Sequence, residues 1–187
     1  MNQPEVVMIG LGYIGLPTAA LIAQNKTYVH GVDINPKVVE TINAGKIHIV
    51  EPELDTAVAN AVEKGYLKAS TTPVKASTYL IVVPTPFKAK NEPDISFVES
   101  ATRAILHLLK ENDLYIIEST SPVGTTEKMM ELIYSERPDL NGKLNIAYCP
   151  ERVLPGNVMY ELVHNDRVIG GVDKKSTERQ YLFIVNL

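Results

Sequence analysis

Cysteine and clustered positive charge are both scarce in this chain of 187 residues. Its single cysteine, Cys149, excludes an internal disulfide and fits a reducing cytoplasm. The net charge is −4 and lysines and arginines form no cluster, which argues against a nucleic-acid or anionic-membrane surface and favours a small anionic ligand. Hydrophobic residues make up 45% of the chain, the share of an ordinary soluble globular protein, so disorder is not expected.

Long hydrophobic runs and targeting signals are missing as well. No segment is long and apolar enough to span a bilayer. The first residues, Met1 to Glu5, lead directly into a predicted strand, without the basic start, apolar stretch and small-residue cleavage site of a secretory signal. We therefore expect a cytoplasmic protein with no membrane partner and no nucleic-acid partner.

A glycine-rich turn near the N-terminus gives the first indication of a ligand. The apolar run 6–9 predicts a buried strand, and Gly10, Gly12 and Gly15 follow it in the spacing G-x-G-x-x-G. An Ala- and Leu-rich helix then begins, with Pro17 in its first turn. In this context the turn lets the backbone approach a pyrophosphate at the N-terminus of the helix. Tyr13 and Ile14 lie inside the turn and either cover the pyrophosphate or only shape the loop.

Asp33 completes the predicted dinucleotide site. It ends a second strand, 28–32, close to the expected spacing of about 20 residues, where a carboxylate can accept hydrogen bonds from the adenosine ribose. A carboxylate there would repel a 2′-phosphate, so the cofactor is predicted to be NAD. Lys37 lies nearby and leaves NADP as an alternative.

Strand and helix patterns alternate along the rest of the chain. This alternation predicts an α/β fold with a doubly wound parallel sheet of the Rossmann type, which binds ligands at the carboxyl ends of its strands. Further strands are predicted at 67–70, 79–83, 114–117 and 145–148, and 166–171 is predicted to be a strand and turn. Helices are predicted at 16–23, 36–45, 51–65 (opened by Glu51 and Pro52), 96–109, from 125 and from 175. The loops that should meet at the ligand edge are 10–15, 84–87, 118–126 and 149–157.

Four motifs in this order resemble the UDP-glucose/GDP-mannose dehydrogenase family, and the resemblance covers nearly the whole chain. They are GLGYIGLP at 10–17, VPTP at 83–86, ESTSPVGTT at 118–126 and PERVLPG at 150–156. Within the family, the last motif together with NDRVIGG at 165–171 is most similar to the enzymes that act on UDP-N-acetyl-D-mannosamine. UDP-glucose enzymes usually carry a second glutamate where this chain has Pro155, which argues against UDP-glucose as the substrate.

The resemblance implies NAD-dependent oxidation of the C6 hydroxyl of a UDP-sugar to a carboxylate, with two NAD molecules used in turn. The family's catalytic cysteine, central helix and C-terminal UDP-sugar domain have no counterpart here. Residues 1–187 are therefore expected to be a truncated N-terminal dinucleotide-binding domain, inactive alone, from an enzyme that dimerises at full length. The alternatives are a non-catalytic NAD-sensing module, another hydroxyacid dehydrogenase, or a 6-dehydrogenase for UDP-GlcNAc, UDP-glucose or GDP-mannose.

The resemblance also assigns roles to residues in the third and fourth motifs. Glu151 matches a glutamate that handles a proton or water, and its alternative is a solvated loop acid or helix cap. Thr120 matches a threonine that positions the catalytic water, or else it stabilises a turn. Arg152 and Val153 match positions that line the sugar-nucleotide site, although Arg152 could instead form a surface ion pair.

Three further predictions concern the remaining polar residues. Thr85 and Thr126 match cofactor contacts near the nicotinamide, and the alternative for the Thr85 segment is loop stiffening between two prolines. Cys149 does not match the family's nucleophile and is interpreted as a packing residue. The four histidines show no spacing typical of a metal site, so no metal is expected.

Overall fold

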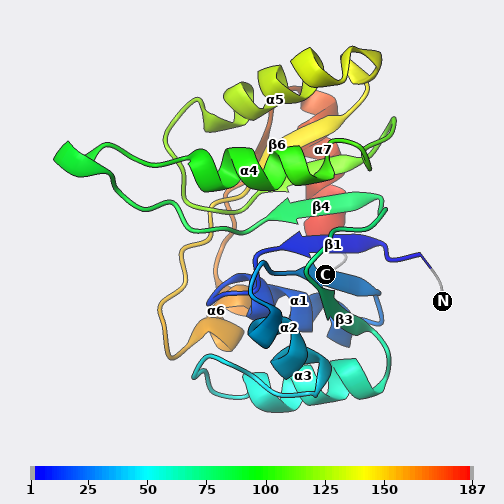
Figure 1. The fold of residues 1–187 in the computed structure, drawn as a ribbon, viewed down its shortest axis with the longest axis vertical. Helices are drawn as coiled ribbons and strands as arrows, with labels where there is room; N and C mark the ends of the chain where they lie inside the picture. Colours follow the sequence, from blue (N-terminus) through cyan, green and yellow to red (C-terminus); the bar gives the residue numbers. More distant parts are fainter. Residues whose placement is uncertain (1–2, 186–187) are drawn as a thin grey trace.

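A seven-stranded sheet forms the centre of the computed structural model, which describes residues 3–185 (Figure 1). The strand order is β3-β2-β1-β4-β5-β6-β7, and every neighbouring pair is parallel except β6 with β7. The order reverses between β1 and β4, which is the switch point where doubly wound sheets bind ligands. The strands are β1 Val6–Ile9, β2 Val29–Val32, β3 Leu67–Ser70, β4 Thr78–Ile81, β5 Leu114–Ile117, β6 Asn145–Tyr148 and β7 Gly170–Gly171.

Helices cover both faces of the sheet and create a hydrophobic core on each side. Successive strand residues point to opposite faces, so Val6 and Met8 belong to the core under α1 and α3, whereas Val7 and Ile9 belong to the core under α4 and α5. The helices are α1 Gly15–Gln24, α2 Pro36–Asn43, α3 Leu54–Glu63, α4 Ser96–Ile105, α5 Thr125–Glu136, α6 Val158–His164 and α7 Lys174–Ile184, with 3₁₀ turns η1 Ala89–Asn91 and η2 Pro138–Leu140. None of the helices in residues 3–185 has the length and hydrophobicity that a bilayer crossing requires.

This architecture confirms the predicted α/β class and the doubly wound sheet. The start of α2 was also predicted from local sequence. The Asn35 side chain accepts a hydrogen bond from the Lys37 backbone N–H, and Pro36 occupies the first turn of the helix. Beyond the end of that helix, Gly45 has a φ of 69°, the left-handed conformation that favours glycine after a helix.

Several predicted boundaries were wrong for identifiable reasons. Strand β4 ends at Ile81 rather than Val83, because the Val83 N–H donates to the Ser119 hydroxyl instead of a neighbouring strand. Helix α3 begins at Leu54, since Glu53 before it has a φ of 64°. Helix α4 ends at Ile105, and the chain then forms a tight turn in which the Leu108 N–H donates to the Ile105 carbonyl oxygen at 2.8 Å.

The C-terminal third departs most from the predicted pattern. Of the strand and turn predicted over 166–171, only Gly170 and Gly171 pair with β6, and they run antiparallel to it. The segment before them stays a loop whose Arg167 side chain turns to two acidic residues. Helix α6, Val158–His164, was not predicted.

Candidate functional site

The glycine turn between β1 and α1 is shaped by close backbone contacts. Gly10 has a φ of 98°, and a Cβ atom on it would lie 2.1 Å from the Val82 carbonyl oxygen. A Cβ on Gly15 would lie 1.9 Å from the Gly10 carbonyl oxygen. At Gly12, by contrast, a Cβ would meet no atom within 4 Å. Two glycines are therefore required for the turn to fold, whereas the third leaves open space beside the backbone.

Unused backbone donors surround that open space. Within residues 3–185, the backbone N–H groups of Gly12, Tyr13 and Ile14 donate to no protein acceptor, and Ile14 precedes α1 without a side-chain cap. Free N–H groups and the helix dipole favour an anion at this position. Tyr13 and Ile14 both lie in the turn, but the Tyr13 side chain is 47% exposed, whereas the Ile14 side chain packs against the core. The turn thus fits a pyrophosphate.

Asp33 lies at the mouth of the same turn. Its carboxylate accepts hydrogen bonds from the Leu11 N–H at 3.2 Å and from the Asn35 N–H at 2.9 Å. These bonds fix the carboxylate at the carboxyl end of β2 while the residue stays partly exposed. A held acceptor at this place is what a ribose hydroxyl needs.

The loops after β4 and β5 are tied together by hydroxyl groups. The Thr85 hydroxyl donates to the Thr120 carbonyl oxygen at 2.6 Å, and the Ser119 hydroxyl donates to the Val83 carbonyl oxygen at 2.7 Å. The Thr120 hydroxyl in turn donates to the Glu151 carbonyl oxygen at 3.4 Å. The structure therefore brings Thr85, Thr120 and Glu151 into one chain of contacts.

Thr126 and Val153 stand apart from this chain of contacts. Thr126, in the first turn of α5, lines a hollow of about 270 Å³ together with Tyr148 and Gly171. Val153 is half-buried in the loop after β6. Arg152 is exposed, and its guanidinium donates to the Asp166 carbonyl oxygen at 3.0 Å, so it forms a backbone contact rather than a surface ion pair.

Glu151 belongs to a largely buried group of charges that we call the acid–arginine group: Glu118, Glu151 and Arg167. Arg167 contacts Glu118 at 2.9 Å and Glu151 at 3.2 Å, and the two acidic side chains are only 2% and 9% exposed. Burial raises the pKa of Glu118 to about 7, although the nearby Arg167 lowers it; the charge of Glu151 raises it further. Sequence reasoning found Glu151 but missed Glu118 and Arg167.

Cys149 lies against this group, and its environment is that of a packing residue. The side chain is 2% exposed in the core under α1. Burial raises the pKa of the thiol to about 11, with Glu118 adding to the effect. A thiol of that kind is poorly nucleophilic at neutral pH, which agrees with the predicted packing role. Among residues 3–185, no group of three or more His, Cys, Asp and Glu side chains could hold a metal ion.

Glu51 holds the loop after β6 from the opposite side. Its carboxylate accepts hydrogen bonds from the Gly156 N–H at 2.8 Å and the Val158 N–H at 2.6 Å, and the residue is almost fully buried. These bonds satisfy free donors at the start of α6. The sequence suggested only that Glu51 opens a helix, because its partners lie more than a hundred residues away.

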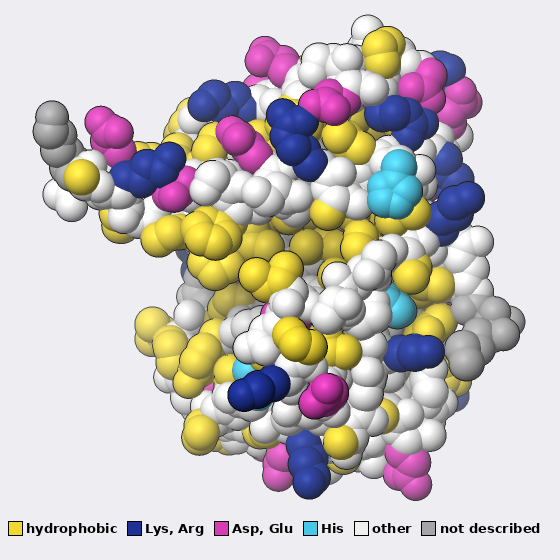
Figure 2. All heavy atoms as spheres, in the orientation of Figure 1, with side chains coloured by type: hydrophobic (Ala, Val, Ile, Leu, Met, Phe, Trp, Pro, Cys, Tyr) yellow, Lys and Arg dark blue, Asp and Glu magenta, His cyan; other side chains and the backbone are white. Residues whose placement is uncertain are grey.

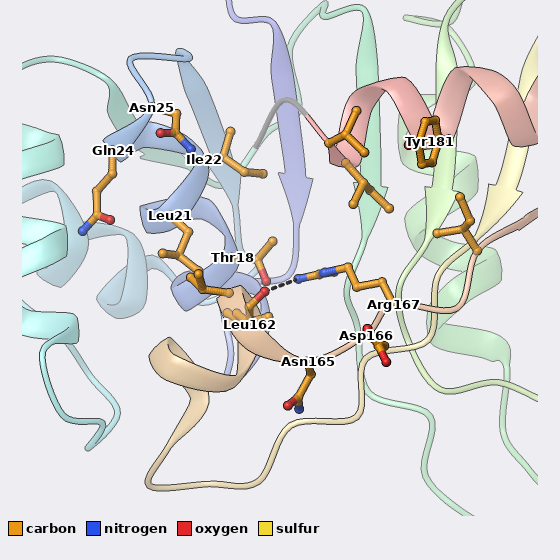
Figure 3. A pocket seen from close by; sticks show the side chains of 14 residues that line it. Thr18, Leu21, Ile22, Gln24, Asn25, Leu162, Asn165, Asp166, Arg167 and Tyr181 are labelled. Atoms are coloured by element: carbon orange, nitrogen blue, oxygen red, sulfur yellow. Dashed lines mark hydrogen bonds between the residues drawn. The ribbon is translucent and has the colours of Figure 1, made fainter.

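Two surface features adjoin the site. A groove of about 590 Å³ lies between α1, α6 and α7, and Figure 3 shows Arg167 reaching into it toward the Leu162 carbonyl oxygen, which it contacts at 3.5 Å. Figure 2 shows apolar side chains gathered on the side where the strand arrows of Figure 1 end. Exposed apolar residues follow four of these strands: Ile34, Phe87, Val123 and Leu154.

Comparison with known proteins identifies the domain. The sequence profile of the UDP-glucose/GDP-mannose dehydrogenase family, NAD binding domain, matches residues 4–183. UDP-N-acetyl-D-mannosamine dehydrogenase of Escherichia coli K12 is 58% identical over 180 residues, which are 92% of this chain and 43% of that protein. NDP-N-acetyl-D-galactosaminuronic acid dehydrogenase of Ralstonia nicotianae is 51% identical over 181 residues, again 92% of this chain and 43% of that protein.

Solved structures agree with this assignment. The UDP-N-acetyl-mannosamine dehydrogenase of Staphylococcus aureus superposes with a TM-score of 0.92 at 38% identity, covering 97% of this chain and 45% of that one. This chain spans less than half the length of these relatives. The predicted Rossmann-type fold and the predicted NAD cofactor are both confirmed by the matched domain. The chain belongs to the UDP-glucose/GDP-mannose dehydrogenase family, of which residues 4–183 form the NAD-binding domain.

Proposed function

We propose that this chain is the NAD-binding part of a nucleotide-sugar 6-dehydrogenase that oxidises UDP-N-acetyl-D-mannosamine to UDP-N-acetyl-D-mannosaminuronate. One observation carries the proposal beyond NAD binding. The loops after β5 and β6 converge so that the Thr120 hydroxyl contacts the Glu151 backbone, at the sheet edge that also bears the glycine turn. A module that only senses NAD would need the glycine turn and Asp33. It would not need the residues that converge in the loops after β5 and β6.

In this proposal the cofactor is held by backbone and side-chain groups of the first two strands. Gly10, Gly12 and Gly15 with Tyr13 and Ile14 would hold the pyrophosphate, whereas Asp33 would accept hydrogen bonds from the ribose. Thr85 and Thr126 are proposed to line the nicotinamide end. NAD, when bound, supplies the acceptor for the hydride that leaves C6 of the sugar.

The second set of residues is proposed to handle water and substrate. Thr120 would hold a water molecule through its hydroxyl, and Glu151 would take a proton from that water as a general base. Arg152 and Val153 would line the sugar-nucleotide site. Converting a primary alcohol to a carboxylate removes four electrons, so two NAD molecules would be needed in turn.

We also propose where the rest of the enzyme lies. The buried Cys149 is not the nucleophile, so the catalytic cysteine, the central helix and the UDP-sugar domain are proposed to belong to a part of the enzyme outside residues 1–187. The isolated domain should bind NADH without turnover, and the whole enzyme is proposed to be a cytoplasmic homodimer.

Calorimetry of the 187-residue chain tests the cofactor part of this proposal. We expect saturable NADH binding and clearly weaker NADPH binding, because the Asp33 carboxylate would repel a 2′-phosphate. No saturable NADH binding would refute the proposal, and equal binding of NADPH would remove Asp33 from its role. Adding NAD and UDP-N-acetyl-D-mannosamine together should produce no NADH absorbance.

The choice of sugar needs a separate experiment. In ¹⁵N NMR spectra of the NADH-loaded chain, UDP-N-acetyl-D-mannosamine should perturb the amides of Arg152 and Val153 more strongly than UDP-glucose does. Equal perturbation by both sugars would support a nucleotide-sugar 6-dehydrogenase but would contradict the preference for UDP-N-acetyl-D-mannosamine. If neither sugar perturbs these amides in an NADH-loaded chain, the non-catalytic NAD module becomes the better description.

A further inference from the structure

One arginine between two buried carboxylates is a feature that the predicted roles do not use. Arg167 Nη1 lies 2.9 Å from Glu118 Oε1, and Arg167 Nη2 lies 3.2 Å from Glu151 Oε2. Glu118 directly follows β5, Glu151 follows β6, and Arg167 follows α6. The guanidinium therefore connects three separate segments of the chain at the ligand edge of the sheet.

Glu118 is the more firmly placed of the two acids. Its N–H donates to the Ile81 carbonyl oxygen at 2.9 Å, which continues the pairing of β4 with β5, and its side chain is 2% exposed. Its carbonyl oxygen accepts from the Glu151 N–H at 3.2 Å. Glu118 can thus serve as a fixed anchor for the guanidinium, whereas Glu151 lies in the more exposed loop.

The acid–arginine group carries fewer cations than acids. Besides the two carboxylates, the titratable group that faces the guanidinium is Cys149, whose Sγ lies 3.9 Å from Nη1. Arg152 supplies no second cation, because its guanidinium contacts the Asp166 carbonyl oxygen. The buried Glu118 accordingly has its pKa raised by desolvation, and this rise is opposed by Arg167 and enlarged by Glu151.

We propose that Arg167 is the positioning residue for Glu151, with Glu118 as the buried anchor that holds the guanidinium in place. The inference rests on the proposed function, in which Glu151 acts on a proton. The Arg152 N–H donates to Glu151 Oε1 at 2.7 Å. The other oxygen, Oε2, is buried and accepts no hydrogen bond within residues 3–185, and its charge partner is Arg167 Nη2 at 3.2 Å, so an ion pair with Arg167 faces this oxygen. A general base must keep hydrogen-bond reach to its proton, and a planar guanidinium anchored to Glu118 through Nη1 presents Nη2 to Glu151 from a fixed direction.

Carboxyl ¹³C NMR titration of Glu118 in the 187-residue chain tests this arrangement. The native midpoint is expected near 7. Arg167→Met should raise the midpoint by about one pH unit or more, because an adjacent arginine favours the charged carboxylate. Glu151→Gln should lower it, because a neighbouring negative charge is removed. Arg103→Met, which breaks an exposed ion pair with Glu136, is the matched control and should leave the midpoint unchanged.

Amide exchange gives a second readout that reports the position of Glu151 itself. In Arg167→Met the Arg152 N–H should exchange about tenfold faster, because the carboxylate that accepts from it is no longer held. If that variant does not fold, the Glu151→Gln titration still decides, since it leaves Arg167 in place. A Glu118 midpoint that stays unchanged in Glu151→Gln, or unchanged Arg152 exchange in folded Arg167→Met, would overturn the inference. Failure of NADH binding by the native chain would instead overturn the proposed function and leave these two readouts intact.

Discussion

The glycine turn and the acid–arginine group occupy the same edge of the sheet but are built in opposite ways. The turn lies within residues 10–15, close to Asp33 in the sequence, and it presents backbone N–H groups beside open space at Gly12. The acid–arginine group joins Glu118, Glu151 and Arg167 from three segments, and its parts are charged side chains that are 2%, 9% and 20% exposed. Sterics shape the first region, and electrostatics shape the second.

This difference predicts that the two regions respond to different changes. The turn should be sensitive to the addition of a single methyl group and largely indifferent to pH. The acid–arginine group should be sensitive to pH and to the loss of a distant partner, while NADH binding at the turn continues. Three experiments test this contrast and a fourth tests how the neighbouring loop after β6 is held, and they are ordered by the size of the expected effect.

The largest effect is expected where a methyl group meets backbone. Gly15→Ala would place Cβ 1.9 Å from the Gly10 carbonyl oxygen, so the turn must distort and the free energy of unfolding should fall by about 3 kcal/mol or more. Gly12→Ala is the matched control, because its Cβ enters open space. It should unfold like the native chain yet bind NADH at least about tenfold more weakly. Denaturant unfolding and calorimetry measure the two effects, and equal stability of the two variants would contradict the steric account.

The second effect is a pH dependence of stability. The pKa of Glu118 is raised from 4.5 to about 7 in the folded chain, so the folded state binds more protons than the unfolded state between these values. This contribution is present below about pH 4.5 and is lost as pH rises through 7, on the order of 3 kcal/mol.

Urea unfolding between pH 5 and 8 should show this decline in the native chain and a smaller one in Glu118→Gln. Asp113, whose pKa is raised to about 6 mainly by burial, adds a decline of the same sign to both proteins. The difference between the two curves therefore isolates Glu118. Parallel curves for the two proteins would show that Glu118 does not titrate in this range.

The third effect comes from the acid that holds the loop after β6. Glu51→Ala removes a buried acceptor from the Gly156 and Val158 N–H groups, and should lower the free energy of unfolding by about 2 kcal/mol. Amide exchange at those two positions should also accelerate. The exposed Glu63→Ala, at the end of the helix α3 that follows Glu51, should change stability by less than about 0.5 kcal/mol. Equal effects of the two substitutions would show that Glu51 does not hold the loop after β6.

The smallest effect concerns the ribose contact. Asp33→Asn keeps an oxygen that can accept from the Leu11 N–H, so stability should change little. The loss of charge should weaken NADH binding about tenfold and narrow the preference for NADH over NADPH. Calorimetry with both cofactors measures this, with Asp139→Asn as a distant control. An unchanged preference would separate Asp33 from cofactor selection.

The sequence predicted the turn well because its requirements are local. The turn and the contacts that require its glycines lie mostly within one strand–turn–helix unit, which contains Gly10, Gly12 and Gly15. Asp33 follows at the end of the next strand. The strands β1 and β5 were likewise predicted, since their continuous apolar runs mark buried parallel strands, and β3 and β6 were predicted at the same bounds although each includes polar residues.

The acid–arginine group could be predicted only in part. Glu151 and Thr120 were proposed from family motifs, but Arg167 stood in an apparent strand and Glu118 in a turn. Their contacts span 49 residues between Arg167 and Glu118, and no local periodicity encodes such a pair. Glu51 was missed for the same reason. One usable signal was present, namely charged residues directly beside apolar strand ends, where burial forces a charge to find a partner.

The backbone of the glycine turn, and not the acid–arginine group, is proposed to receive the cofactor. Mapping of NADH onto the ¹⁵N NMR spectrum of the native chain tests this proposal most directly. We predict the largest shifts at the amides of Gly12, Tyr13 and Ile14 and a shift at Asp33, with much smaller changes at Glu118 and Arg167. Large shifts at Glu118 and Arg167 with an unperturbed turn would contradict the account.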